Sequence, residues 1–166
     1  EEDRKIVLPA REAAFAAEKQ PEKGNDGLYC GAALELPDGS IVTGKNSPLM
    51  HASSSCILNA VKILAKLPDD LMLISPEVLE AVSKLKSDIQ NSRRLSLDME
   101  EMMIALSVST LSNPAVKLAI EKLRDLRECE MHITHMPTSG DEAGLRKLGI
   151  NLTCDANFSS KNLFVD

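Results

Sequence analysis

The sequence predicts an α/β domain: a three-layer α/β/α sandwich with a mixed sheet of about five strands. Residues 29–36 and 40–43 are β-prone and flank Pro37-Asp38-Gly39, whose fixed and free backbone angles suit a hairpin turn. Residues 52–67 are apolar on most faces of a helix, which favours burial of that helix against the sheet. Later segments alternate between helical and strand character, so helices are expected on both faces of the sheet.

The remaining elements follow from capping residues and spacing. Ser75 and Pro76 suit the start of one helix, and Asn113 and Pro114 suit the start of another. Helices are predicted over residues 3–19, 77–86, 98–110, 114–126 and 141–148, and further strands over residues 71–74, 129–136 and 150–153. We expect one domain over residues 1–166, with an N-terminal helix and loop (1–27), an α/β core (28–154) and a poorly packed tail (155–166).

Length and charge exclude several classes of protein. A chain of 166 residues with 43% hydrophobic and 27% charged residues is typical of one globular domain. No apolar run reaches the roughly 20 residues needed to span a bilayer, so no membrane partner is expected. The net charge of −6 is spread along the chain and no basic cluster is dense enough to follow a phosphate backbone, so no nucleic-acid partner is expected either.

The composition is poor in aromatic residues. One Tyr, three Phe and no Trp leave the core to aliphatic side chains and methionine, and they cannot build base-stacking platforms. The four cysteines are widely spaced with no C-x-x-C pair, and we expect buried, reduced thiols in a cytoplasmic protein: Cys30, Cys56, Cys129 and Cys154.

The most suggestive site lies at the start of the helix predicted over residues 52–67. His51 is followed by the small hydroxyl residues Ser53, Ser54 and Ser55. A helix start offers free N–H donors and a partial positive charge, which suit a small anionic ligand. Lys45 and Asn46, at the end of the preceding strand, could reach the same place. The alternative is that one serine caps the helix and the others only pack.

Three other local patterns suggest a function at first, but the sequence around each argues against it. Residues 39–46 nearly spell a phosphate-binding Walker A loop, but Asn46 replaces the Ser or Thr that binds magnesium, and the intervening residues are β-prone. His132 and His135 would lie on opposite faces of a strand, which argues against joint metal ligation. A nucleophile pair between His51 and Ser54 or Ser55 lacks an identifiable group to orient the histidine.

The order of hairpin and buried helix resembles the front half of a cytidine-deaminase-like fold. Such folds place a zinc ligand and a glutamate at the helix start, and two cysteines at a second strand-to-helix junction. Here His51 could stand for the first ligand, but Ser53 replaces the glutamate, and Glu77 and Glu80 replace the cysteines. We therefore expect no bound metal and no deamination.

Four segments resemble the C-terminal domain of an uncharacterised bacterial family, domain of unknown function 1846. They are residues 33–45 (ALELPDGSIVTGK), 73–77 (LISPE), 104–107 (IALS) and 147–154 (KLGINLTC). The resemblance extends from Ile6 to Thr153. It implies that the chain is the C-terminal third of a longer cytoplasmic protein, whose N-terminal portion has a glycine-rich, phosphate-binding-type loop. It also implies cytidine-deaminase-like topology, and it supplies no catalytic residues.

Two functions remain open, and neither requires a cofactor in this chain. The first is a non-catalytic accessory or ligand-sensing domain that binds an anion or nucleotide and serves the N-terminal portion of the same polypeptide. The second is an enzyme active site shared with that portion, to which His51, Lys45 and Glu77 contribute. A homo-oligomer is a third possibility, compatible with the stripe of Met99, Met102 and Met103, although such stripes more often belong to the core.

Overall fold

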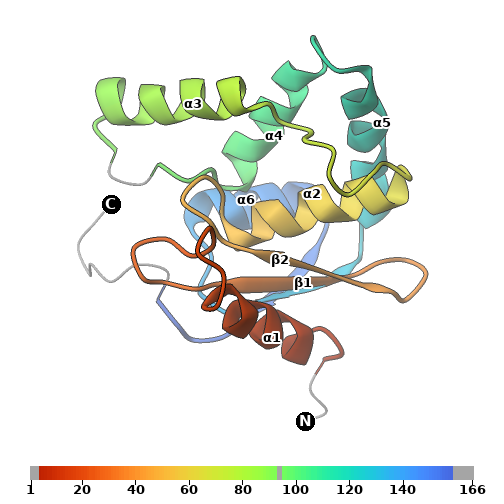
Figure 1. The fold of residues 1–166 in the computed structure, drawn as a ribbon. Coiled ribbons are helices and arrows are strands. Elements are labelled where there is room, and N and C mark those ends of the chain that lie inside the picture. Colours follow the sequence, from red (N-terminus) through yellow and green to blue (C-terminus); the bar gives the residue numbers. More distant parts are fainter. Residues whose placement is uncertain (1–3, 93–94, 159–166) are drawn as a thin grey trace.

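The computed structural model describes residues 4–92 and 95–158 and confirms a mixed α/β fold (Figure 1). A four-stranded open sheet has the order β2-β1-β3-β4. The strands are β1 (Gly31–Glu35), β2 (Ile41–Lys45), β3 (Glu130–Ile133) and β4 (Asn151–Cys154). The helices are α1 (Val7–Ala17), α2 (Ala52–Leu64), α3 (Pro76–Lys84), α4 (Met99–Ser109), α5 (Pro114–Lys122) and α6 (Ser139–Lys147). A π-helical turn, Leu85–Ile89, extends α3, and a 3₁₀ turn, Leu123–Leu126, extends α5.

The predicted hairpin is confirmed. Strands β1 and β2 are antiparallel, with Ala33 opposite Thr43, and β1 also pairs antiparallel with β3, whereas β3 and β4 are parallel. Gly39 closes the turn with φ of 87°, a left-handed conformation that glycine adopts freely. Its N–H donates to the Leu36 carbonyl at 2.8 Å.

Helices lie on both faces of the sheet. Figure 1 shows α1 below the strands and the other helices above them. The main core lies between the sheet and the upper helices and consists largely of aliphatic side chains and methionine, as the composition predicts. A smaller core of Ile6, Ala10 and Ala33 joins α1 to the lower face.

The strand predicted over residues 71–74 is wrong, so the described residues form four strands rather than about five. Leu73 and Ile74 are buried at 4% and 3% exposure, but they lie in a bend rather than in the sheet. The Leu71 N–H closes a turn on the Pro68 carbonyl, and Ser75 already caps α3. Only residues 72–74 lie between this turn and the cap, and a short apolar run does not by itself distinguish a strand from another buried segment.

The other predicted elements are present, with bounds that differ by a few residues. Asp98 and Glu101 form a reciprocal capping box at the start of α4, and Asn113 caps α5 through the N–H of Ala115. The predicted tail is partly bound: the Asp155 N–H donates to the Ile133 carbonyl at 3.0 Å. Residues 159–166 of that tail lie outside the described residues.

The predicted placement of sulfur-containing side chains is right for most positions. Met99 and Met102 are fully buried in the core and Met103 is half-buried, so this stripe belongs largely to the core. All four cysteines are free thiols, but Cys154 is exposed on β4, so the expectation of burial is wrong there.

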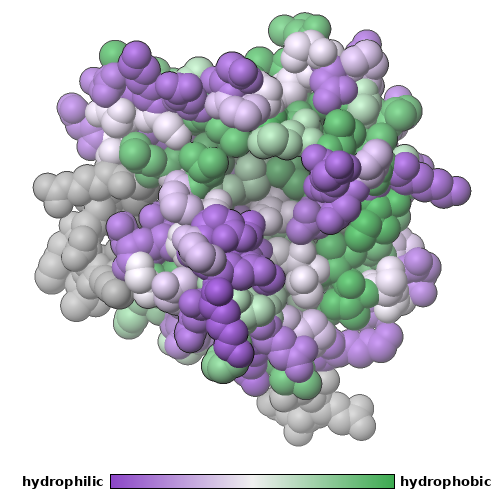
Figure 2. Space-filling model, in the orientation of Figure 1, coloured by the Kyte–Doolittle hydropathy of each residue, from purple (hydrophilic) through white to green (hydrophobic). Residues whose placement is uncertain are grey.

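Figure 2 shows exposed apolar atoms in both the upper and the lower part of the molecule, and Leu8 and Phe15 of α1 are among the exposed apolar residues. On the upper side, one exposed apolar stripe follows α4 and continues just past its end, with Ile104, Val108 and Leu111. None of the helices formed by the described residues is long and apolar enough to cross a membrane.

Two glycines allow helix backbone to contact strand backbone. A Cβ at Gly44 would lie 2.3 Å from the Cys56 nitrogen of α2, and one at Gly31 would lie 2.1 Å from the Ala10 carbonyl oxygen of α1. Both distances are far below a normal contact. The hairpin is therefore held between two helices at positions where only glycine fits.

We predict that Gly44→Ala lowers the free energy of unfolding by about 3 kcal/mol, because the new methyl group meets backbone that cannot rotate away. Urea unfolding measures this. Gly39→Ala is the matched control, since a Cβ at Gly39 meets no atom within 4 Å. Its cost is backbone strain alone, about 1–2 kcal/mol. A Gly44→Ala protein as stable as the wild type would contradict the close approach of β2 and α2.

Candidate functional site

A histidine and an aspartate form the centre of the candidate site. His51 is the N-cap residue of α2, with an extended backbone (φ −68°, ψ 156°), and its side chain makes no capping hydrogen bond. Its Nδ1 lies 2.7 Å from Oδ2 of Asp141. The His51 side chain is 22% exposed and that of Asp141 only 6%, so the pair is buried at one end and open at the other.

Asp141 brings three helix starts together. It lies in the first turn of α6, where its own N–H donates to Oγ1 of the capping residue Thr138 at 3.2 Å. Its Oδ1 accepts from the Ser53 hydroxyl of α2 at 3.0 Å and from the Met99 N–H of α4 at 2.9 Å. A helix start favours negative charge, so all three helices stabilise this carboxylate.

The environment keeps Asp141 ionised. Burial opposes the charge of Asp141 and would raise its pKa. The hydrogen bond and the charge of His51, together with the Met99 N–H and the Ser53 hydroxyl, outweigh this effect and hold the pKa of Asp141 below its ordinary value. An ionised carboxylate only accepts hydrogen bonds. The proton between the two side chains therefore lies on Nδ1 of His51.

Two neighbouring groups have their pKa displaced upward. Burial raises the pKa of Asp98, and the carboxylates of Glu101 and Asp141 raise it further. Burial and then the charge of Asp141 raise the pKa of the Cys30 thiol to about 12. Cys30 is accordingly a thiol at neutral pH and a poor nucleophile.

The three predicted serines have different surroundings. Ser53 joins His51 through their shared partner Asp141. Ser54 is fully buried and donates to the Leu97 carbonyl at 3.2 Å, so its hydroxyl faces the interior. Ser55 is half-buried. Ser53 contacts the carboxylate and not the imidazole, so the described residues contain no serine–histidine–aspartate chain.

Lys45 and Asn46 lie away from His51 and Ser53. The Lys45 ammonium contacts Oε1 of Gln20 at 3.3 Å, just past the end of α1. The buried Asn46 side chain accepts from the Cys30 N–H at 2.8 Å and donates to the Leu28 carbonyl at 3.1 Å. Asn46 thus orders the loop before β1, and the structure brings together only His51 and the start of α2 from the predicted set.

The residue that sequence reasoning missed is Asp141. It is 90 positions from His51, and helical periodicity explains it as an acidic residue in the first turn of a capped helix. One indirect signal of such a residue is present in the sequence: a functional His51 would need a group to orient its ring, and no neighbouring residue could be identified for that role. Such a partner is visible only once the helices are packed.

The remaining patterns have structural roles or none. Residues 39–46 contain strand β2, as predicted, and not a phosphate-binding loop. His132 is 4% exposed and contacts Thr153 Oγ1 at 2.8 Å and Asp155 Oδ1 at 3.1 Å. His135 follows β3 and lies beside Thr134 Oγ1 at 2.9 Å. Within residues 4–92 and 95–158, no three His, Cys, Asp or Glu side chains are placed to hold a metal ion.

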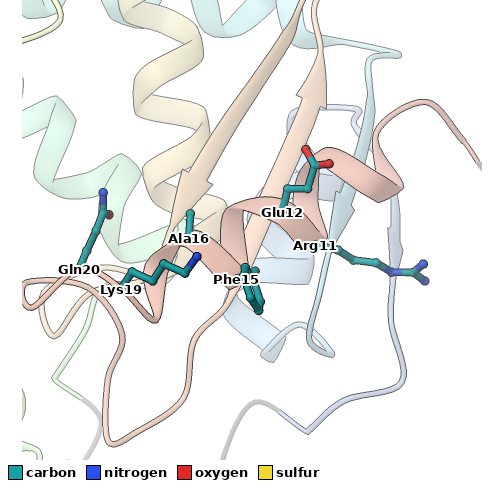
Figure 3. Close-up of a pocket in the computed structure, with 6 residues that line it drawn as sticks. All are labelled: Arg11, Glu12, Phe15, Ala16, Lys19 and Gln20. Carbon is teal, nitrogen blue, oxygen red and sulfur yellow. The ribbon is translucent and has the colours of Figure 1, made fainter.

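A shallow hollow lies along α1 (Figure 3), and α1 lies on the opposite side of the sheet from α2 and α6 (Figure 1). The Phe15 ring and the Lys19 ammonium, 4.8 Å from the ring centre, line it with Arg11 and Glu12. Arg11 is bound to Asp155 through both carboxylate oxygens. All the lining residues come from one helix and its end, so this hollow is a surface depression rather than an enclosed site.

The fold and the site together define an α/β domain that holds a partly exposed histidine on a buried carboxylate. The chain belongs to the family described as domain of unknown function DUF1846, C-terminal, whose model matches residues 2–164. It is 44% identical over 164 residues to a UPF0371 protein of Clostridium botulinum strain Eklund 17B, covering 99% of this chain and 32% of that protein. UPF0371 proteins of Clostridium tetani and Clostridioides difficile are 43% and 44% identical, again over 32% of their length.

The chain therefore spans about a third of the length of the curated relatives it matches. These relatives have names that assign no function. The family membership confirms the resemblance seen in the sequence. It assigns no reaction, substrate or partner to the whole protein.

We predict that Asp141→Asn makes stability less dependent on acid pH. Because the folded state lowers the pKa of Asp141, the stability from its charge is fully present above the unfolded pKa, about 3.9, and is lost as pH falls through the lower folded value. The variant should lose about 2 kcal/mol near neutral pH and show a shallower decline in acid. Urea midpoints between about pH 6 and pH 3 measure this. Asp70→Asn, at an exposed aspartate, is the control and should follow the wild type.

Proposed function

We propose that this domain contributes His51 and Asp141 as a general acid–base pair to an active site shared with the remaining portion of the polypeptide. The observation that supports this is the 2.7 Å contact between Nδ1 of His51 and Oδ2 of Asp141. A second supporting feature is the 22% exposure of the His51 side chain. Among the described residues, Nε2 of His51 has no hydrogen-bond partner that would block it.

The chemistry follows from the proton positions. With Nδ1 donating to an ionised Asp141, a neutral His51 presents the lone pair of Nε2 to the open side. Nε2 can take a proton from a substrate or from water, and the carboxylate stabilises the imidazolium that forms. Histidine suits this role because its charge changes near physiological pH. Asp141 is a positioning residue, since it acts through His51.

The rest of such a site would come from the longer polypeptide. The described residues supply no nucleophile beside Nε2, and the chain spans only 32% of its relatives. The family resemblance implies a phosphate-binding-type loop in the preceding portion, so we propose a phosphorylated or nucleotide substrate in a cytoplasmic protein. Glu77, the other residue considered for this shared site, lies exposed on α3.

We also propose a distant relation to cytidine-deaminase-like folds, without zinc chemistry. The antiparallel hairpin followed by α2, with His51 at its start, supports that relation. Ser53 stands where the acid–base glutamate would be, and Glu77 and Glu80 are exposed on α3. The acid–base role would fall to His51 itself.

A second candidate is the accessory or ligand-sensing role, in which the domain binds a small anion without catalysis. A protonated His51 would present the N–H of Nε2 to an anion from a ring already fixed by Asp141. The Ser54 hydroxyl faces the interior, so a charge introduced there would disturb the fold and would not test this role. The anion contact would rest on His51 and Ser55. No cofactor, and no homo-oligomer, is needed for either role.

The shared-site proposal predicts that His51→Ala in the full-length protein lowers kcat by at least about a hundredfold, because a general acid–base group contributes roughly 10²–10⁴. The assay is turnover of nucleoside triphosphates and phosphorylated metabolites. His132→Ala is the matched control, because His132 is also a buried histidine bound to an aspartate, on the other face of the sheet. Wild-type turnover in His51→Ala would exclude His51 from the chemistry.

The ligand-sensing role predicts that inorganic phosphate or a nucleotide raises the melting temperature of the full-length protein, since a ligand that binds only the native state stabilises it. His51→Gln should abolish that rise, as should Ser55→Glu, which adds a negative charge at the half-buried position of α2. The His132→Ala control should retain it. A rise that survives in both variants would place the ligand elsewhere.

A further inference from the structure

Strand β4 is an outer strand whose free edge is open. Asn151 donates its N–H to the Cys129 carbonyl at 2.9 Å, and Asp155 donates to the Ile133 carbonyl at 3.0 Å. In a parallel ladder, alternate residues bond to the same neighbour. The N–H and C=O groups of Leu152 and Cys154 therefore point away from β3, and within the described residues no strand meets them.

The opposite edge of the sheet is partly covered. On β2 the outward carbonyl of Thr43 accepts from the Asn59 side chain of α2 at 3.0 Å. Natural proteins also protect edges with charged residues, proline or bulges. The four residues of β4, Asn-Leu-Thr-Cys, include no charge and no proline, and β4 is mostly exposed. Arg4 donates to the Thr153 hydroxyl and the Asn151 carbonyl, but no described residue bonds the outward N–H and C=O groups of Leu152 and Cys154.

An apolar hollow of about 380 Å³ lies beside that edge, between β4 and α6. Leu145, Ile150 and Leu152 form its apolar lining, with Cys154 at the strand and Glu142 and Arg146 at the rim. Leu152 and Cys154 lie opposite Met131 and Ile133, so their side chains share the face that packs toward the main core. A strand added here could pair its backbone with β4 and place every second side chain in the hollow.

We propose that an extended segment of the amino-terminal portion of the same polypeptide adds to the free edge of β4 as a fifth strand. The chain spans 32% of its relatives and matches a family model described as C-terminal, so the longer proteins have roughly two thirds of their length to supply it. A tethered segment also has a high effective concentration at this edge. Apolar residues would alternate with polar ones in that segment, to fit the hollow and its charged rim.

The docking position lies next to the candidate site without depending on its function. Helix α6 has Asp141 in its first turn, bound to His51, and Leu145 one turn later, in the lining of the hollow. A segment bound along β4 would bring the amino-terminal portion against this helix.

The experiment is hydrogen exchange of the full-length protein with single-residue resolution. Amides of Asn151 and Thr153 face β3 and serve as internal controls, protected whether or not a strand is added. We expect the Leu152 and Cys154 amides to be protected at least about tenfold over the unstructured rate. Exchange of these two amides at the unstructured rate, with Asn151 and Thr153 protected, overturns the proposal.

Two further measurements identify the occupant. Protection that weakens on dilution would assign the edge to a second copy of the chain and overturn the intramolecular proposal. Cys154→Glu, at an exposed position on the hollow, should remove the protection of Leu152, whereas Cys154→Ser should keep it. Because exchange does not measure turnover, failure here and failure of the His51→Ala prediction are separate outcomes.

Discussion

The buried carboxylate of Asp141 is the interaction on which the arrangement of the upper helices depends. A charge in the interior is costly unless hydrogen bonds and opposite charge surround it. Asp141 of α6 meets this condition with His51 and the Ser53 hydroxyl at the start of α2 and with the Met99 N–H at the start of α4. The starts of α2, α4 and α6 must therefore lie together, and that meeting point also orients His51.

A comparable network stabilises the lower face of the sheet. Asp155 accepts both from Arg11 of α1, at 2.8 Å and 3.1 Å, and from His132 of β3. These contacts and the charge of His132 hold the pKa of Asp155 below its ordinary value, with Arg11 the largest cause. Both ring nitrogens of His132 are used, whereas Nε2 of His51 has no partner within residues 4–92 and 95–158. That difference separates a structural histidine from a candidate functional one.

The sequence was sufficient for elements whose signals are local. Pro37-Asp38-Gly39 predicts the hairpin, and Ser75 and Asn113 predict helix starts, because a turn or a cap involves residues a few positions apart. The strand expected at residues 71–74 failed because apolar character reports burial and not backbone pairing. Lys45 was expected beside His51, yet strand alternation directs it to the α1 face. Asp141 could not be found, since its role depends on the packing of three helices.

Gly31 and Gly44 have a consequence for any molecule that reaches His51. With no side chain at these positions, α1 and α2 press directly on the two faces of the hairpin, and neither helix can slide without a backbone clash. The loop bearing His51, residues 46–51, connects the end of β2 to the start of α2, and a bridge between Ser47 and Met50 tightens it. A preorganised site loses little conformational entropy on binding. Recognition at this histidine would thus be of the lock-and-key type, in which the bound molecule fits a conformation that the domain already has.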